Sequence, residues 1–101
     1  MTQESLRALE MSVEILQPGR AKLIDSVPVR EELAGGAVWE GVVHVFRLEG
    51  NPRATRAYGW WSPAAGGERR FTVALHRWKV TSPVEAVREA IGPSFRITKD
   101  K

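Results

Sequence analysis

The densest run of aromatic and β-branched residues lies between positions 38 and 80 and contains all four tryptophans. Residues of these types favour the half-buried surface of a β-sheet. Three segments, 38–48, 54–61 and 70–80, are separated by clusters of Gly, Pro, Asn and Ser. Strands joined by short turn-forming segments predict an antiparallel meander.

The first of these strands is apolar on both faces. Its even positions place Val38, Val42, Phe46 and Leu48 beside Glu40 and His44, and its odd positions place Trp39, Val43 and Val45 beside Gly41 and Arg47. A strand with two apolar faces needs a cover on each. We therefore expect helices on one side of the sheet and a second subunit on the other.

The clearest helix signal begins at Ser82. Ser82 is a favoured N-cap residue, Pro83 suits the first helical position, and Glu85 completes a capping box. Val84 and Val87 begin an apolar stripe at helical spacing, and the stop signal is Gly-Pro at positions 92–93. The pattern predicts a helix over about 83–91, followed by a short strand at 94–98.

A second helix is predicted at about 26–34. Ser26 can cap it, Pro28 is tolerated in its first turn, acidic residues follow, and Gly35 can end it. This helix has barely two turns, so contacts with the rest of the fold must stabilise it.

Two interpretations remain open for residues 2–17. Thr2 as N-cap, with Leu6, Leu9, Val13 and Leu16 at spacings of three and four, predicts a helix. The alternation of Met11, Val13 and Ile15 with polar residues instead favours a strand. The segment 17–20 (Gln-Pro-Gly-Arg) is a turn that either ends a helix or closes a hairpin with 21–24. We favour a short helix followed by that hairpin.

Together these patterns predict an α+β fold in a single domain of residues 1–101. An antiparallel sheet of four to five strands packs against short helices at about 26–34 and 83–91. The chain has no cysteine, which excludes a disulfide framework. No signal-peptide pattern or membrane-length apolar run is visible, and we expect a cytoplasmic location without membrane contact.

The net charge of +3 is unevenly distributed. Residues 1–50 carry five basic and eight acidic side chains, whereas residues 51–80 carry six basic side chains and one acidic one. The positive excess therefore lies on the second and third strands of the meander and their turns. An arrangement of this kind either solvates the outer face of a sheet or attracts an anionic partner.

Basic and aromatic side chains are interleaved in this positive region. Arginines that bind phosphates, beside rings that stack on bases, are typical of single-stranded nucleic-acid binding. Tyr58 and Trp60 share a predicted face with Arg56, whereas Trp78 faces away from Arg77 and Lys79. The candidate binding residues are Arg53, Arg56, Tyr58, Trp60, Arg69, Arg70, Arg77 and Lys79.

Catalytic and metal-binding motifs are not visible in the sequence. His44 and His76 lie on the first and third predicted strands, about 10 Å apart by the usual strand spacing. Neither forms a compact ligand pattern with a carboxylate such as Glu40. We therefore expect no cofactor, no bound metal and no catalytic residues, and we interpret both histidines as ordinary sheet residues.

Two families share short features with the chain. The segment 56–61 (Arg-Ala-Tyr-Gly-Trp-Trp) resembles the aromatic signature of RNA-recognition motifs, but it differs at the second and last positions, and a strand rather than a helix follows. The order of a meander followed by a helix resembles a double-stranded-RNA-binding domain. Segment 84–89 is nearly neutral where that family is basic. Neither resemblance assigns the chain to a family.

The leading hypothesis is a small non-enzymatic binding module that uses its basic and aromatic surface, 53–79, for an anionic partner such as nucleic acid. The alternative is a homodimeric assembly protein that pairs through the apolar face of strand 38–48. An enzyme of an undetected type is the third hypothesis.

Overall fold

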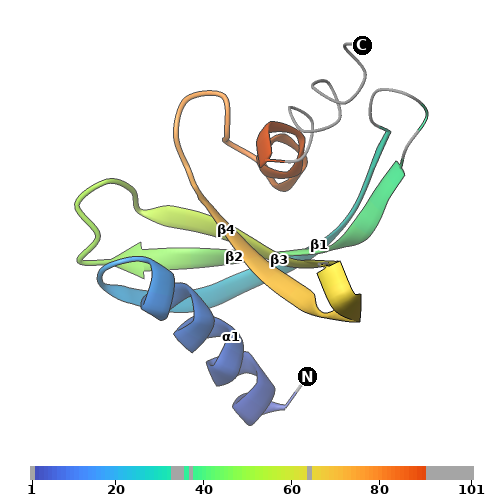
Figure 1. Cartoon of the computed structure of the whole chain (residues 1–101). Helices are drawn as coiled ribbons and strands as arrows, with labels where there is room; N and C mark the ends of the chain where they lie inside the picture. Colours follow the sequence, from blue (N-terminus) through green and yellow to red (C-terminus); the bar gives the residue numbers. More distant parts are fainter. Residues whose placement is uncertain (1, 33–35, 37, 64, 91–101) are drawn as a thin grey trace.

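The computed structural model describes residues 2–32, 36, 38–63 and 65–90. Its centre is one antiparallel sheet in which the four strands follow in sequence order (Figure 1). The strands are β1 (Arg20–Glu32), β2 (Val38–Glu49), β3 (Arg56–Pro63) and β4 (Arg69–Leu75). This arrangement confirms the predicted α+β fold and its meander.

The N-terminal segment forms helix α1 (Gln3–Leu16). The side chain of Thr2 caps it by accepting a hydrogen bond from the Ser5 backbone N–H at 3.1 Å. Leu9 and Val13 are buried against the sheet, which explains why the helical spacing prevails over the strand alternation. The predicted turn at 17–20 leads from α1 into β1, so the predicted hairpin with 21–24 is wrong.

The predicted helix at 26–34 is also wrong over its described part, because residues 26–32 belong to β1. Val27 and Val29 pair with β2 residues, and Val29 is buried. Pro28 is tolerated there because β1 lies at the edge of the sheet, where one side of the strand needs no hydrogen-bond partner. Cross-strand pairing therefore overrides the local helix-start signals of this segment.

The two hairpins of the sheet separate along part of their length. β1 pairs with β2 from Arg20 to Glu32, with a register shift between Leu23 and Asp25. By contrast, β2 pairs with β3 only over 44–47 and 56–59. Beyond this short junction the β1–β2 and β3–β4 hairpins diverge, as the right-hand side of Figure 1 shows. The sheet therefore branches into two arms.

Each face of the sheet is covered by a helix of the same chain. On one side α1 packs on a cluster that includes Phe46, Leu48 and Ala57. On the other side a second helix, described over 83–90, packs on the larger cluster (Figure 1). The buried members of that cluster are Val29, Val43, Val45, Tyr58, Trp60, Val80, Ala86 and Val87. Of the two apolar faces of β2, the one that α1 covers is buried at Phe46 and Leu48, whereas Val38 and Val42 on the same face are nearly half exposed.

The second helix begins where the capping signal predicts. Ser82 Oγ accepts a hydrogen bond from the Glu85 backbone N–H at 3.3 Å. The Glu85 carboxylate bonds to the Thr81 backbone N–H and hydroxyl, at 2.8 and 2.6 Å. The predicted end of this helix at residue 91 and the predicted strand at 94–98 lie outside the described residues.

Candidate binding surface

The structure places two of the candidate binding residues in the core. Tyr58 and Trp60 are 1% and 0% exposed and contact the cluster under the second helix. Burial raises the pKa of the Tyr58 phenol, whose hydroxyl lies 2.7 Å from His76 Nδ1. Neither ring is displayed for stacking on a ligand.

A third aromatic side chain, Trp61, is partly exposed but already has neighbours. The Arg69 guanidinium lies 4.8 Å from the centre of its indole ring, and the Phe71 ring centre lies 4.9 Å away. Arg70 pairs across the strands with Ser62, and its side chain is exposed. Arg69 and Arg70 therefore lie together near the start of β4, where Arg69 stacks on a ring of the protein itself.

The chain turns sharply between β4 and the second helix. Arg77 and Val80 exchange two backbone hydrogen bonds, N–H to carbonyl, of 3.0 and 2.8 Å. Lys79 has a φ of +75°, in the left-handed region that residues other than glycine seldom occupy. The predicted strand 70–80 therefore ends at Leu75, and residues 77–80 form a tight turn that we call the 77–80 turn.

This turn displays Trp78, whose side chain is 81% exposed, between the exposed Arg77 and Lys79. Trp78 forms one wall of a hollow of about 330 Å³ against the start of the second helix. Because the sequence pattern placed Trp78 within a strand, its display went unpredicted. The only sequence feature that could have indicated this exposure is the position of Trp78 and Lys79 shortly before the N-cap Ser82, in the connection between a strand and a helix.

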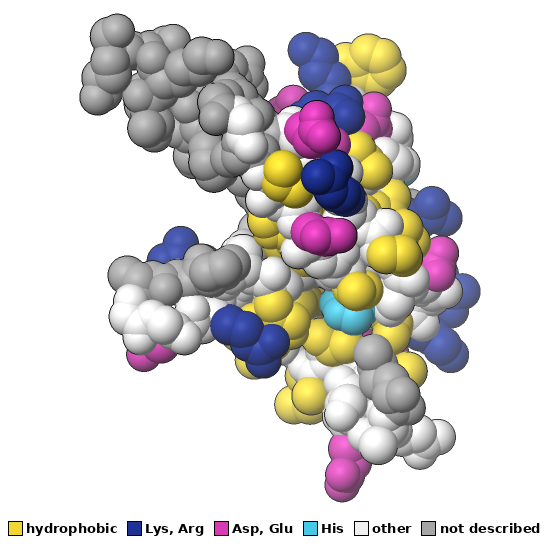
Figure 2. All heavy atoms as spheres, turned by 90° about the vertical axis from the view of Figure 1, so that its right-hand side faces the viewer, with side chains coloured by type: hydrophobic (Ala, Val, Ile, Leu, Met, Phe, Trp, Pro, Cys, Tyr) yellow, Lys and Arg dark blue, Asp and Glu magenta, His cyan; other side chains and the backbone are white. Residues whose placement is uncertain are grey.

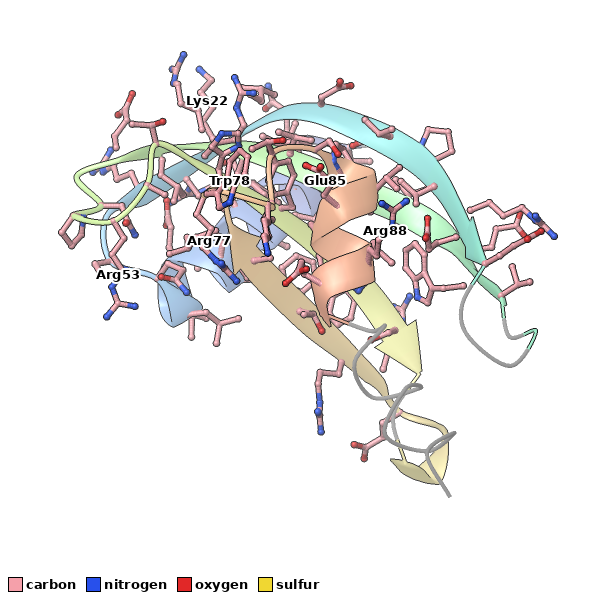
Figure 3. All side chains as sticks on the ribbon, turned by 90° about the horizontal axis from the view of Figure 1, so that it is seen from above. Lys22, Arg53, Arg77, Trp78, Glu85 and Arg88 are labelled. Atoms are coloured by element: carbon pink, nitrogen blue, oxygen red, sulfur yellow. The ribbon has the colours of Figure 1, made fainter. Side chains whose placement is uncertain are left out.

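A third basic residue, Arg53, reaches the same end of the molecule from the loop between β2 and β3. The Asn51 side chain fixes this loop by accepting hydrogen bonds from the Arg53 and Ala54 backbone N–H groups, at 2.8 and 3.0 Å. Arg53 and Arg77 line one hollow of about 390 Å³, together with the acidic Glu89. Figure 3 shows Arg53, Arg77 and Trp78 at this end.

The remaining candidate, Arg56, is exposed at the start of β3. Its carbonyl oxygen accepts a hydrogen bond of 2.9 Å from the His76 backbone N–H, which ties β3 to the segment before the 77–80 turn. The structure thus displays Arg77 and Lys79 on the turn that carries Trp78, and it places Arg53 beside Arg77 in the neighbouring hollow. Arg69 and Arg70 lie apart from them, near the start of β4.

The two histidines lie on opposite faces of the sheet. His76 bonds to Tyr58 on the side of the second helix, whereas His44 lies on the α1 side, 2.8 Å from Ser26 Oγ through its Nδ1 atom. Burial lowers the pKa of His44. The described part of the chain contains no group of three potential metal ligands, and none of its helices has the length and apolar character needed to cross a membrane.

Comparisons of the chain with protein-family models, with curated proteins and with solved structures gave no match.

Proposed function

We propose that the protein is a small non-enzymatic binding module that holds single-stranded nucleic acid at its 77–80 turn. The observation that carries this proposal is the display of Trp78, 81% exposed, between two basic side chains. A flat ring in solvent stacks on an unpaired base, and neighbouring cations bind the flanking phosphates. Bases inside a duplex are already stacked, so the arrangement favours single strands.

The backbone of the turn supports this interpretation. A residue other than glycine in the left-handed region costs roughly 1–3 kcal/mol, and such strain is concentrated at functional sites. Lys79 adopts this conformation within a turn closed by two hydrogen bonds. The conformation sets the direction of both Trp78 and Lys79, so the ring and the charge are positioned before a ligand arrives.

Three basic side chains supply the charge of the site, namely Arg53, Arg77 and Lys79. The nearby acidic residue Glu85 is engaged by Thr81, and the Arg88 side chain is paired with Glu31 at 2.9 Å. The hydrogen bonds from Thr81 lower the pKa of Glu85, so this carboxylate stays ionised. Glu89 lines the hollows beside both Arg77 and Trp78, so two negative charges of the second helix offset part of the positive charge. We therefore expect a weak, salt-sensitive interaction with about three phosphates.

The test is a titration of fluorescein-labelled oligothymidylate, followed by anisotropy at several salt concentrations. For about three phosphate contacts the slope of log K against log salt is about −2. Trp78→Ala removes the stacking and weakens binding roughly 5- to 150-fold, the equivalent of about 1–3 kcal/mol. Arg77→Ala makes the salt slope shallower by about 0.7.

The matched control is Arg30→Ala, which removes an exposed arginine near the far end of β1. It preserves both the affinity and the salt slope if the site is the 77–80 turn. The proposal fails if neither oligothymidylate nor oligouridylate binds at low salt, or if Trp78→Ala and Arg30→Ala weaken binding equally.

A further inference from the structure

One edge of β2 is unpaired where the sheet branches. Over Val38–Val43 the strand pairs with β1 on one side, but its ladder with β3 begins only at His44. No described residue pairs with the other edge of 38–43. A row of free backbone N–H and C=O groups of this kind is a template for a further strand.

The outer edge of β1, in contrast, is protected. The Glu14 and Glu10 carboxylates of α1 accept hydrogen bonds from the backbone N–H groups of Ala21 and Leu23, both at 2.9 Å. Further along the strand, Pro28 removes a donor. A covering helix and a proline are both common means of blocking an edge. The β2 edge has neither kind of protection over 38–43. Two apolar side chains of this segment, Val38 and Val42, are nearly half exposed.

A groove opens at the His44 end of this free edge, between α1 and the sheet. It has a volume of about 310 Å³ and is lined by Ser5, Ala8, Leu9, Ser12, His44 and Trp61. No charged side chain lines it, and Trp61 and Leu9 make much of it apolar. Figure 2 looks onto the end of the molecule where the arms diverge, and hydrophobic side chains gather between them.

Two polar features mark the ends of the groove. His44 is 9% exposed, and its Nδ1 atom is engaged by Ser26, which leaves Nε2 as the ring nitrogen for a ligand. At the Trp61 end, the Arg69 guanidinium lies over the indole ring. The groove therefore combines an apolar floor, one buried hydrogen-bonding group and a positive charge at its rim.

From these features we infer that the free edge of β2 binds an extended peptide segment of a partner protein as an added strand. Main-chain hydrogen bonds to 38–43 hold such a peptide, and its alternate side chains enter the groove. The apolar lining selects a large hydrophobic side chain, and Arg69 selects an acidic residue beside it. The site lies at the end of β2 opposite Arg53 and does not depend on nucleic-acid binding.

The experiment titrates ¹⁵N-labelled protein with the synthetic peptide acetyl-Thr-Val-Thr-Phe-Thr-Glu-Glu-amide. The expected result is a set of shifts in the backbone amides of 38–43 and of residues that line the groove. The same peptide N-methylated at alternate amides cannot extend the sheet, and its affinity falls at least tenfold. Replacing the two glutamates of the peptide by lysines weakens binding, because lysine is repelled by the positive charge of Arg69.

Two variants of α1 locate the peptide. Ala8→Glu places a charged chain in the groove from an exposed helical position and reduces the affinity at least tenfold. Met11→Glu introduces the same charged side chain at an exposed α1 position outside the groove and preserves binding. Three outcomes overturn the inference: no shifts in 38–43, equal binding of the N-methylated peptide, or a dimer in sedimentation that Val42→Lys dissociates, because the occupant is then a second copy.

Discussion

The edge of the Trp39 ring packs against Trp60, with ring centres 6.3 Å apart and planes at 72°. Trp39 belongs to the β1–β2 arm and Trp60 to the β3–β4 arm. Their contact therefore crosses the branch of the sheet, where the backbone hydrogen bonds between β2 and β3 have ended. Side-chain packing, rather than strand pairing, connects the two arms on this face.

The first prediction is that these two rings are energetically coupled. Trp60→Ala removes a fully buried ring and lowers the free energy of unfolding by about 3–5 kcal/mol. Trp39→Ala lowers the free energy of unfolding by a smaller amount, because Trp39 is only partly buried. In the double variant the losses fall short of their sum by about 0.5–1.5 kcal/mol, the usual coupling of an edge-to-face pair. Urea unfolding of the four proteins measures this, and additive losses would show that the arms are independent.

The second prediction concerns the carboxylate that joins α1 to β1. The Ala21 backbone N–H, and after it the Arg7 guanidinium, lower the pKa of Glu14. Because the folded pKa lies below the unfolded one, the stabilisation is present above the unfolded pKa and is lost as pH falls toward the folded pKa. Glu14→Gln therefore lowers stability by about 1 kcal/mol at pH 7.

The measurement is denaturant unfolding of both proteins between neutral and acidic pH. Wild type and Glu14→Gln converge in stability as the pH falls below the ordinary range of a glutamate. Glu4→Gln is the matched control, because Glu4 is exposed in the first turn of the same helix. A constant difference between wild type and Glu14→Gln at every pH would contradict the assigned role of the carboxylate.

The third prediction is a pH dependence from His44. Burial lowers its pKa, so the unfolded chain takes up a proton at a higher pH than the folded protein does. Above the unfolded pKa, near 6.5, both states are neutral and the group has no effect. As pH falls below that value, the unfolded state gains the proton first and stability decreases.

His44→Gln keeps a polar side chain within reach of Ser26 but cannot be protonated. We expect its stability to fall less than that of wild type between pH 7 and pH 5.5. NMR titration of the His44 ring in the folded protein gives the pKa directly. A value at or above that of an unfolded histidine would refute the prediction.

The sequence predicts the sheet well where the pattern and the tertiary contacts agree. Strand 38–48 is observed as Val38–Glu49, and helices cover both of its faces from Val43 to Leu48. At 26–34 the local signals and the contacts conflict. A helix start is favoured by Ser26, Pro28 and the following acidic residues. The pairing of Val27 and Val29 with β2 stabilises the strand more than these signals stabilise a helix.

The candidate surface was predicted only in part, for a different reason. Alternation shows which residues share a face but does not show which face a distant helix covers. The second helix buries the face of Tyr58 and Trp60, and the turn after β4 exposes Trp78. The charges of Arg53, Arg77 and Lys79 were recognised because they depend on composition alone. The display of Trp78 between Arg77 and Lys79 depends on the turn, whose left-handed Lys79 has no sequence signature.

The last prediction separates stability from binding at Lys79. Glycine occupies the left-handed region without the steric cost that a side chain brings, although it also increases the entropy of the unfolded chain. We expect Lys79→Gly to raise the free energy of unfolding by about 0.5–1 kcal/mol. The same change removes a positive charge beside Trp78, so affinity for oligothymidylate decreases and the salt slope becomes shallower by about 0.7.

Lys79→Asn is the matched control, since asparagine tolerates the left-handed conformation better than most residues and is uncharged. It loses the same charge with a smaller gain in stability. If the charge of Lys79 contributes to binding, both variants bind oligothymidylate more weakly than wild type, and Lys79→Gly is the more stable of the two variants. A stabilised Lys79→Gly with unchanged affinity would show that the 77–80 turn is strained without a role for the lysine charge.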